Sequence, residues 1–400
     1  MVPWGRIGAS AILISLSATR RSPSSRLATP ALAITAFVTG ASTVIMGTLP
    51  LLIGYFADGL RLDWQQIGWL GAAGMSGTLA GTLLAYGLIE RGVLRLGQQL
   101  GAGAALAFWL LAASTDSFPM LLWWMASTST GVGCVFAIGT YVLGRSSVPA
   151  RNFSIMSGVQ VACGAVHAAA LPWIDAQFGH AVALSSVAFW FALILILASG
   201  QSAVAVNANS SVTESIPPAA DRAARDRSAA WLLVPVLAFQ TAGVVIWIYS
   251  ERMGTAAGIA HGQIAAGIAL GNLGGIPASL LGTLAGERFG YLRILSLATV
   301  ALVCGELLIF AAPGASAYVG GQFVFNFGWM LGVSYYLGML AKNDPSGRMI
   351  RLAPVTLVIA GAIGPLFVAS STTHSHPIAI LCLSLLFSTG ALAVAAVRRG

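Results

Sequence analysis

Charged side chains are scarce in this chain. Lys, Arg, Asp and Glu together make up 8% of its 400 residues, whereas soluble domains carry about 25%. Hydrophobic residues make up 57%, against roughly 45–50% in soluble domains. So little charge excludes an ordinary soluble protein and predicts a surface that faces lipid. The net charge of +8 is spread along the chain, which argues against a nucleic-acid partner.

Cysteine is also rare. Cys134, Cys163, Cys304 and Cys382 each lie inside an apolar run, spaced neither as loop pairs nor as metal ligands. We therefore expect free, buried thiols, no disulfide and no metal site.

The motifs of several enzyme classes are missing from the sequence. It has no G-x-x-x-x-G-K-[ST] loop for nucleotide phosphates, no H-E-x-x-H, no G-x-S-x-G and no paired carboxylates within an apolar run. These absences argue against a nucleotide-driven pump and against a membrane-embedded enzyme, and we expect no cofactor.

Long apolar runs are what the sequence does contain. A hydrocarbon core about 30 Å thick needs a helix of about 20 residues. The sequence predicts an all-α polytopic membrane protein with twelve such helices. The predicted spans are 30–57, 67–88, 94–114, 119–143, 153–174, 180–200, 230–250, 262–285, 293–312, 316–340, 351–371 and 376–397.

The cations indicate how these spans are oriented. All Lys and Arg residues except Arg61 and Arg252 fall before the first span, in alternate connections or at the C-terminus. Short connections rich in Lys and Arg stay cytoplasmic. We therefore expect both termini to be cytoplasmic in a multi-pass protein of the cytoplasmic (inner) membrane.

The chain divides into two similar halves. Residues 1–29 are interpreted as a cytoplasmic extension, 30–200 as an N-terminal six-helix half, 201–229 as a cytoplasmic linker and 230–400 as a C-terminal six-helix half. A shift of 197 positions places Gly74 on Gly271, Gly77 on Gly274 and Glu90–Arg91 on Glu287–Arg288. Glycines three apart share one helix face and allow close helix packing. This repeat predicts two pseudo-symmetric halves.

The loops after the second and eighth spans carry a related motif. Gly286–Arg293 reads GERFGYLR, and Gly87–Arg95 reads GLIERGVLR. This pattern resembles the major facilitator superfamily of secondary transporters, although Tyr86 and Thr283 replace the leading glycine of the family motif. The resemblance implies that Glu90, Arg91, Glu287 and Arg288 form a cytoplasmic gate.

The same resemblance implies a substrate cavity between the halves, lined mainly by spans 1, 4, 7 and 10 with help from 2, 5, 8 and 11. Polar or aromatic residues on these spans are the predicted substrate-binding residues: Gln240, Asn326, Gln160, His167, Asn272 and Trp247. Bonding between helices is the alternative role for the amides, and an interfacial position is the alternative for Trp247. Since no Lys or Arg lies in the interior of a span, a neutral or weakly charged substrate fits best.

Two ionisable residues lie inside predicted spans and are candidates for proton coupling. Histidine has an unperturbed pKa near 6.5, so its charge can change near physiological pH, and His167 lies in the fifth span. Glu306 is a carboxylate in the ninth span. A neutral His167 bonded to a neighbouring helix is the alternative. Asp58 and the Glu251–Arg252 pair are interpreted as solvated charges at the outer helix ends, with an extracellular gate as the alternative.

Together these features predict a secondary active transporter that takes up a small organic solute with a proton by alternating access. Export of drugs or metabolites is the alternative, and a sensor that does not transport is the second alternative. The expected partners are the small-molecule substrate, a proton or another coupling ion, and the lipid bilayer, and the expected state is a monomer.

Overall fold

The computed structural model describes residues 23–144, 149–200, 230–285, 288–311, 314–344, 349, 352–370 and 376–397, and within these ranges the regular structure is helical. In this part of the chain eleven helical segments are long and apolar enough to cross a membrane. The remaining predicted span, 351–371, is a shorter apolar helix of 17 residues. The expectation of an all-α protein with twelve apolar spans is therefore confirmed.

Three spans consist of two helices each, where the sequence predicted one. The helices in chain order are α1 (Pro23–Ser42), α2 (Val44–Leu60), α3 (Trp64–Glu90), α4 (Leu94–Ala113), α5 (Phe118–Gly144), α6 (Pro149–Phe178), α7 (His180–Ser185), α8 (Val187–Gly200), α10 (Leu233–Ala256), α11 (His261–Asn272), α12 (Gly275–Ala285), α13 (Tyr291–Phe310), α14 (Ala315–Asn343), α15 (Ala353–Ala369) and α16 (His376–Val397).

Local side-chain chemistry explains the break in the first span at Thr43. The hydroxyls of Ser42 and Thr43 donate to the carbonyls of Thr39 and Gly40, both at 2.7 Å. Such bonds compete with the backbone ladder of the helix. Pro50 then removes a further ladder bond from α2. In the eighth span, the break between α11 and α12 falls at Leu273–Gly274, where glycine weakens the helix.

The internal repeat predicted from the sequence is visible in the packing. A Cβ added to Gly77 would meet the backbone of Ala126, and one added to Gly274 would meet the backbone of Phe323. The two contact residues are again 197 positions apart. Glycine is needed at both places because the backbones of spans 2 and 4, and of spans 8 and 10, come into direct contact. The two halves are therefore pseudo-symmetric in structure.

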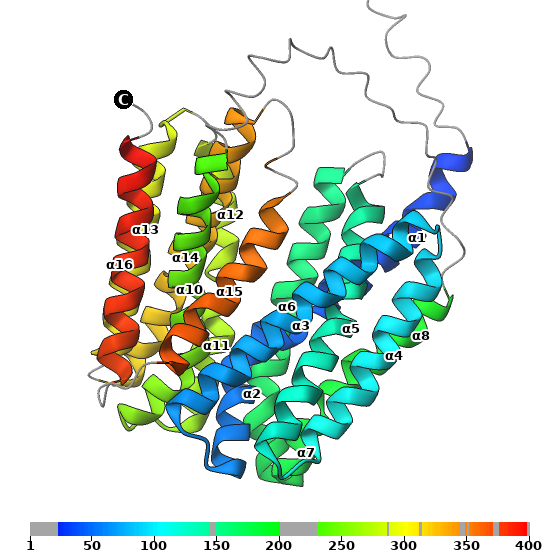
Figure 1. Cartoon of the computed structure of the whole chain (residues 1–400), viewed down its shortest axis with the longest axis horizontal. Helices are drawn as coiled ribbons and strands as arrows, with labels where there is room; N and C mark the ends of the chain where they lie inside the picture. The colour runs from blue at the N-terminus through cyan, green and yellow to red at the C-terminus, as the bar shows by residue number, and fades with distance from the viewer. Residues whose placement is uncertain are drawn as a thin grey trace, which may run out of the picture.

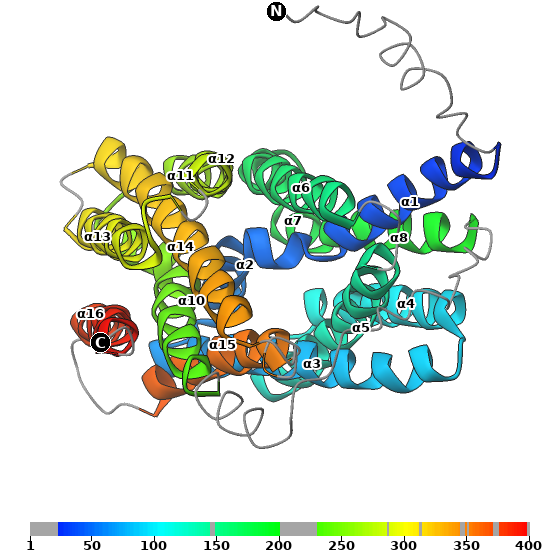
Figure 2. The ribbon, with the colours of Figure 1, turned by 90° about the horizontal axis from the view of Figure 1, so that it is seen from above.

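The N-terminal half, α1 to α8, and the C-terminal half, α10 to α16, lie side by side and meet at the end of the bundle away from the described chain ends (Figures 1 and 2). There α3 packs on α15, α11 on α6 and α2 on α10. The other half of the eighth span, α12, packs on α14 within its own half. The halves are thus joined at one end and diverge toward the other.

The sequence predicts that all four cysteines are free and buried. The four cysteines are free, but only Cys134 and Cys163 are buried, whereas Cys304 and Cys382 are exposed on α13 and α16. The prediction of buried thiols is wrong for these two because their sides of the helices face outward. The predicted boundaries at residues 200 and 229 adjoin residues outside the described ranges, whereas the boundary at residue 29 falls within α1, which begins at Pro23. The division of the chain at these positions stays a prediction.

Candidate functional site

Side chains from spans 7, 8 and 10 converge on the middle of the first span, at the contact between the halves. We call Gln240, Trp247, Asn272 and Trp329 the central cluster. Trp247 Nε1 donates to the carbonyl of Met46 at 2.9 Å, and Asn272 Nδ2 donates to the carbonyl of Gly47 at 2.9 Å. Both bonds cross from the C-terminal half to the N-terminal half. The cluster therefore lies where a carrier of two halves needs its substrate site.

The sequence explains why the Met46 carbonyl is available. In a regular helix it would accept the N–H of the residue four positions later, but that residue is Pro50 and has no N–H. An unpaired carbonyl away from water is costly. The indole of Trp247 supplies the missing donor. Trp247 is 4% exposed, so its alternative placement in an interfacial belt is wrong.

A second indole fixes the orientation of Gln240. Trp329 Nε1 donates to Gln240 Oε1 at 3.0 Å, and because an indole is a donor only, the amide oxygen must face it. The ring of Trp329 lies against Gly243, where any side chain would collide with it. The amide nitrogen of the half-buried Gln240 makes no bond that the described residues account for. It is therefore free to donate to a ligand.

The two indoles of the central cluster also lie close to one another. The rings of Trp247 and Trp329 are 6.4 Å apart between centroids and inclined by 47°. This spacing is typical of two aromatic rings in direct contact. One amide donor beside two indoles fits a neutral ligand with a planar part and a hydrogen-bond acceptor.

Asn326 and Gln160 were also predicted to bind substrate. Asn326 is 3% exposed, and its Nδ2 donates to the carbonyl of Gln322 on its own helix at 3.0 Å. It lies between α14 and α11, next to Gly271. Gln160 is half-buried on α6, close to Gly40 of α1. The structure therefore places Asn326 in the contact between α14 and α11, and Gln160 in the contact between α6 and α1 of the N-terminal half.

His167 lies within the N-terminal half. Its Nδ1 accepts from Trp190 Nε1 at 3.1 Å, and its Nε2 lies 3.5 Å from Ser186 Oγ. Since an indole can only donate, Nδ1 carries no proton in this arrangement. His167 is 4% exposed. These contacts match the alternative role of a neutral histidine that joins α6 to α8.

Glu306 lies within the C-terminal half and is fully buried. Ser384 Oγ lies 2.6 Å from Glu306 Oε1 and 3.1 Å from the carbonyl of Ala242. A hydroxyl has one proton and can donate to one of these acceptors at a time. Both contacts are satisfied when Ser384 donates to Ala242 and a protonated Glu306 donates to Ser384. Glu306 then links α13, α16 and α10.

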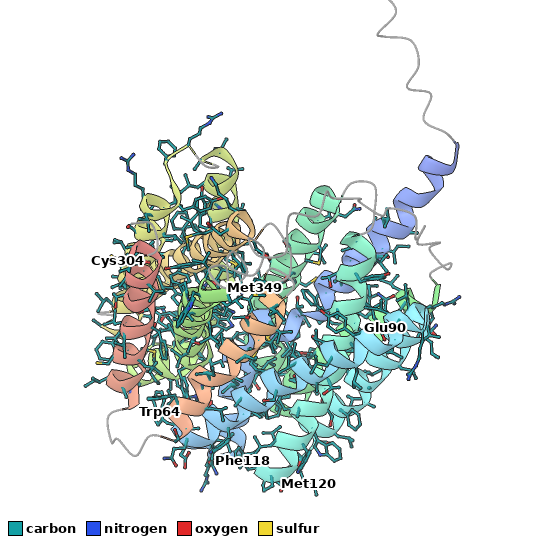
Figure 3. All side chains as sticks on the ribbon, turned by 45° about the horizontal axis from the view of Figure 1, so that its top comes forward. Trp64, Glu90, Phe118, Met120, Cys304 and Met349 are labelled. Carbon is teal, nitrogen blue, oxygen red and sulfur yellow. The ribbon has the colours of Figure 1, made fainter. Side chains whose placement is uncertain are left out.

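Three residues of the predicted cytoplasmic gate, Glu90, Arg91 and Arg288, lie in the described part of the chain, and they do not meet across the halves. Glu90 and Arg91 are exposed at the end of α3, and Glu90 lies at the edge of the N-terminal half away from the C-terminal half, whereas Trp64 at the start of α3 lies at the junction (Figure 3). Arg288 is exposed, and Glu287 lies outside the described residues. A gate formed in another conformation remains a prediction.

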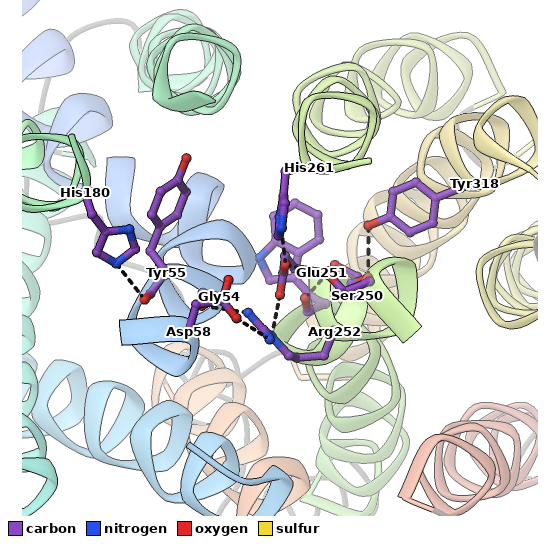
Figure 4. Close-up of polar contacts among 11 residues, drawn as sticks. Gly54, Tyr55, Asp58, His180, Ser250, Glu251, Arg252, His261 and Tyr318 are labelled. Carbon is purple, nitrogen blue, oxygen red and sulfur yellow. Dashed lines mark hydrogen bonds and ion pairs between the residues drawn. The ribbon is translucent and has the colours of Figure 1, made fainter. Parts of the chain in front are cut away.

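Charges at the joined end form a second group, which we call the outer cluster: Asp58, Glu251, Arg252, Thr255 and His261. Arg252 Nη1 lies 2.8 Å from Asp58 Oδ1, and Arg252 Nη2 donates to the carbonyl of Gly54 at 2.7 Å. Arg252 Nε also lies 2.7 Å from Glu251 Oε2. The pair between Arg252 and Asp58 thus joins span 7 to span 1 (Figure 4).

Glu251 is the most buried charge of the outer cluster. It is 3% exposed, accepts from Thr255 Oγ1 at 2.9 Å and has His261 Nδ1 at 3.9 Å. The interpretation of Glu251 as a solvated end charge is therefore wrong. Its carboxylate fits against Gly54, where a side chain would collide with it. A buried carboxylate of this kind depends on its cation, because an unpaired charge there would be expensive.

A cavity of about 200 Å³ opens beside the outer cluster. Asp58, Tyr55 and His180 line it from the N-terminal half, and Glu251 and His261 line it from the C-terminal half. His180 Nε2 lies 3.0 Å from the Tyr55 carbonyl and Nδ1 lies 3.7 Å from Asp175. The cavity leads from the joined end of the bundle to Glu251.

Sequence reasoning did not find Trp329 or the Met46 carbonyl. Two signals were present. Pro50 frees the carbonyl four residues before it, and Gly243 provides a flat helix face on which a large ring can lie. Neither signal identifies the indole that makes the contact, because Trp247 and Trp329 lie far along the chain from Met46 and Gly243.

Comparisons with known proteins agree with this architecture. No family model and no curated protein matches the sequence. Among solved structures, the nucleoside transporter NupG is similar with a TM-score of 0.70 at 11% identity, over 92% of this chain and 97% of that chain. The POT family transporter PepTSo has a TM-score of 0.71 at 13% identity, over 92% of this chain and 97% of that chain.

A bacterial homologue of the human lysosomal transporter Spinster, in its inward-facing and occupied conformation, is similar with a TM-score of 0.65 at 14% identity. The similarity covers 93% of this chain and 96% of that chain. All three proteins are transporters with the same arrangement of helices. This chain shares the fold of these three transporters, which is compatible with its sequence resemblance to the major facilitator superfamily.

Proposed function

We propose that this protein is a secondary active transporter that moves a small organic solute across the cytoplasmic membrane by alternating access. The observation that carries the proposal is the central cluster. It gathers an amide donor and two indoles halfway through the membrane, between halves that are joined on one side of it. A site in this position is exposed to either side when the halves rock against each other.

The conformation supports the same mechanism. With both termini cytoplasmic, as the distribution of Lys and Arg predicts, the joined end is extracellular. The molecule is then inward-facing, and the outer cluster is the closed extracellular gate. The separation of Glu90 and Arg288 from the opposite half fits a cytoplasmic gate that is open in this state.

The substrate class follows from the central cluster, which contains no charged side chain. A neutral or weakly charged solute with a planar group and an acceptor would use the Gln240 amide and the indoles of Trp247 and Trp329. We further propose uptake driven by protons. Glu251 is the best candidate for the coupling group, because it is buried at the gate and lines a cavity open to the outer side.

The first test is a search for the solute. Purified protein is screened by thermal shift against neutral and weakly charged compounds. Nucleosides and short peptides are tested first, because structurally similar proteins are named as nucleoside and peptide transporters. Hits are then tested for counterflow in liposomes that contain the protein. We expect at least one hit to exchange across the liposome membrane.

The same assay separates the alternatives. Accumulation with an inward proton gradient supports uptake, and accumulation with an outward gradient would identify an exporter. A compound that stabilises the protein but never exchanges would favour the sensor and would contradict the proposal.

The orientation has its own test. Single cysteines are placed at Arg145, Arg225 and Arg348, and at Asp116 and Gln177, in a variant that lacks the four native thiols. We expect an impermeant maleimide to label positions 116 and 177 in intact cells, and positions 145, 225 and 348 only after lysis. Labelling of position 225 from outside would reverse the topology and make the observed conformation outward-facing.

A further inference from the structure

A second cavity, of about 380 Å³, lies on the outside of the N-terminal half. It exists because α3 and α4 both pack extensively on α5 but make little contact with each other. The floor is made of small residues, among them Gly97, Gly101 and Gly131, and Leu84 and Leu100 form its walls. We call this cavity the lateral groove.

The lateral groove opens toward the membrane along its length. Leu84 and Leu100 are each 60% exposed within apolar spans, so their side chains face lipid. From Gly97 to Phe108 the groove follows α4 for about 16 Å at about 1.5 Å per residue. This length matches one leaflet, which is half of a core about 30 Å thick.

The internal repeat allows the residues that line the groove to be compared with their equivalents in the C-terminal half. At the positions 197 residues later, Gly97 is replaced by Ile294, Thr130 by Phe327 and Cys134 by Leu331. Ile294 and Leu331 are buried there, at 6% and 1% exposed. At these three positions the C-terminal half thus carries larger side chains than the N-terminal half, whereas Phe108 of the groove corresponds to Gly305. The repeat therefore does not preserve the lining of the groove.

One end of the groove carries a positive charge. Arg91 lines it where α3 ends, at the membrane surface on the side of the chain ends. Arg95 is directed elsewhere, since its guanidinium donates to the carbonyl of Ser199 at the end of α8. Within the groove the polar groups are few, and the Thr130 hydroxyl is already bonded to the carbonyl of Ala126 at 2.8 Å. The groove is therefore apolar with a cation at its mouth.

We propose that the lateral groove is a binding site for an anionic phospholipid, whose phosphate pairs with Arg91 and whose acyl chain lies along α4. The length of one leaflet, the lateral opening and the single cation at headgroup depth fit this ligand. A water-soluble solute would need more polar partners than the groove offers. Basic sites between helices at the cytoplasmic surface attract anionic headgroups. The proposal does not depend on transport.

The test measures lipid binding to the delipidated full-length protein by native mass spectrometry, with phosphatidylglycerol and phosphatidylcholine of identical acyl chains as probes. We expect the wild type to prefer phosphatidylglycerol. Arg91→Gln should lower the affinity for phosphatidylglycerol about fivefold, as expected for one cation near an anionic headgroup, and leave phosphatidylcholine unchanged. Arg288→Gln, at the equivalent position of the C-terminal half, should leave the affinities for both lipids unchanged.

Thr130→Phe tests the apolar part of the groove. It introduces the side chain that the C-terminal half carries at the equivalent position, so we expect weaker binding of both lipids with an unchanged melting temperature. Ala104→Leu is a second variant that fills the groove. Equal binding of the two lipids by the wild type, or unchanged binding in Arg91→Gln or in both filled variants, would overturn the proposal.

Discussion

Glu251→Gln is expected to abolish accumulation of the substrate by an imposed proton gradient, while exchange of substrate between the two sides continues. The ionised Glu251 holds Arg252, which also binds Asp58 and the Gly54 carbonyl of the opposite half. A proton on Glu251 removes one of the two negative charges that hold Arg252 and so weakens the closed outer gate. Gate closure and proton binding are then linked, and each must affect the other.

Glutamine has nearly the shape of glutamate but cannot exchange a proton, so the variant should still rock between its states without moving a proton. The measurement is uptake into liposomes with an inward proton gradient, compared with counterflow at equal pH. Asp175→Asn is the matched control, because Asp175 lines the same cavity but pairs with His180 within the N-terminal half. Wild-type accumulation in Glu251→Gln would rule Glu251 out and return the question to Glu306 and His167.

The spans and the repeat could be predicted from the sequence because both rest on local patterns. An apolar run of membrane length has few alternatives in lipid other than a helix. The shift of 197 residues places Gly77 on Gly274. Each of these glycines packs against the fourth span of its half, at corresponding backbone positions. A glycine at a direct backbone contact leaves no room for a larger residue, so the repeat in the sequence is also a repeat in the helix packing.

The contacts between the halves could not be predicted in the same way. Trp247 with Met46 and Asn272 with Gly47 join residues about two hundred positions apart. Such pairs depend on the register between halves and on the state of the transport cycle. The sequence thus identified Gln240, Trp247 and Asn272 as polar or aromatic groups at the right depth, but not the carbonyls or the second indole that they contact.

The outer cluster shows a different limit. Charges at helix ends are usually solvated, so Glu251 and Arg252 gave no local sign of burial. Burial arises because Gly54 of α2 leaves room for the carboxylate and because Asp58 reaches Arg252 from the other half. Glu306 and His167 were recognisable as ionisable groups inside spans, yet their partners Ser384 and Trp190 lie on neighbouring helices that the sequence does not pair.

Gln240→Ala is expected to weaken substrate binding by about 5- to 150-fold, corresponding to the loss of a hydrogen bond worth about 1–3 kcal/mol in a site shielded from water. Trp329 Nε1 holds the amide oxygen at 3.0 Å, so the amide nitrogen is the group left to donate to the proposed substrate. Gln240→Glu separates the two functions of the side chain. It keeps an acceptor for Trp329 but lacks the donor, so the loss of affinity should be similar if the donor is what the substrate uses.

The measurement is the dissociation constant of the solute found in the thermal-shift screen, by calorimetry on purified variants. Asn326→Ala serves as the comparison, because Asn326 was predicted for the same role but bonds the Gln322 carbonyl of its own helix. We expect Asn326→Ala to lower the melting temperature and leave the affinity unchanged. If Asn326→Ala weakened binding as much as Gln240→Ala, the substrate site would extend from the central cluster to Asn326. If Gln240→Ala bound as the wild type does, the amide donor would have no part in recognition, and the indoles of Trp247 and Trp329 would have to select the substrate by stacking alone.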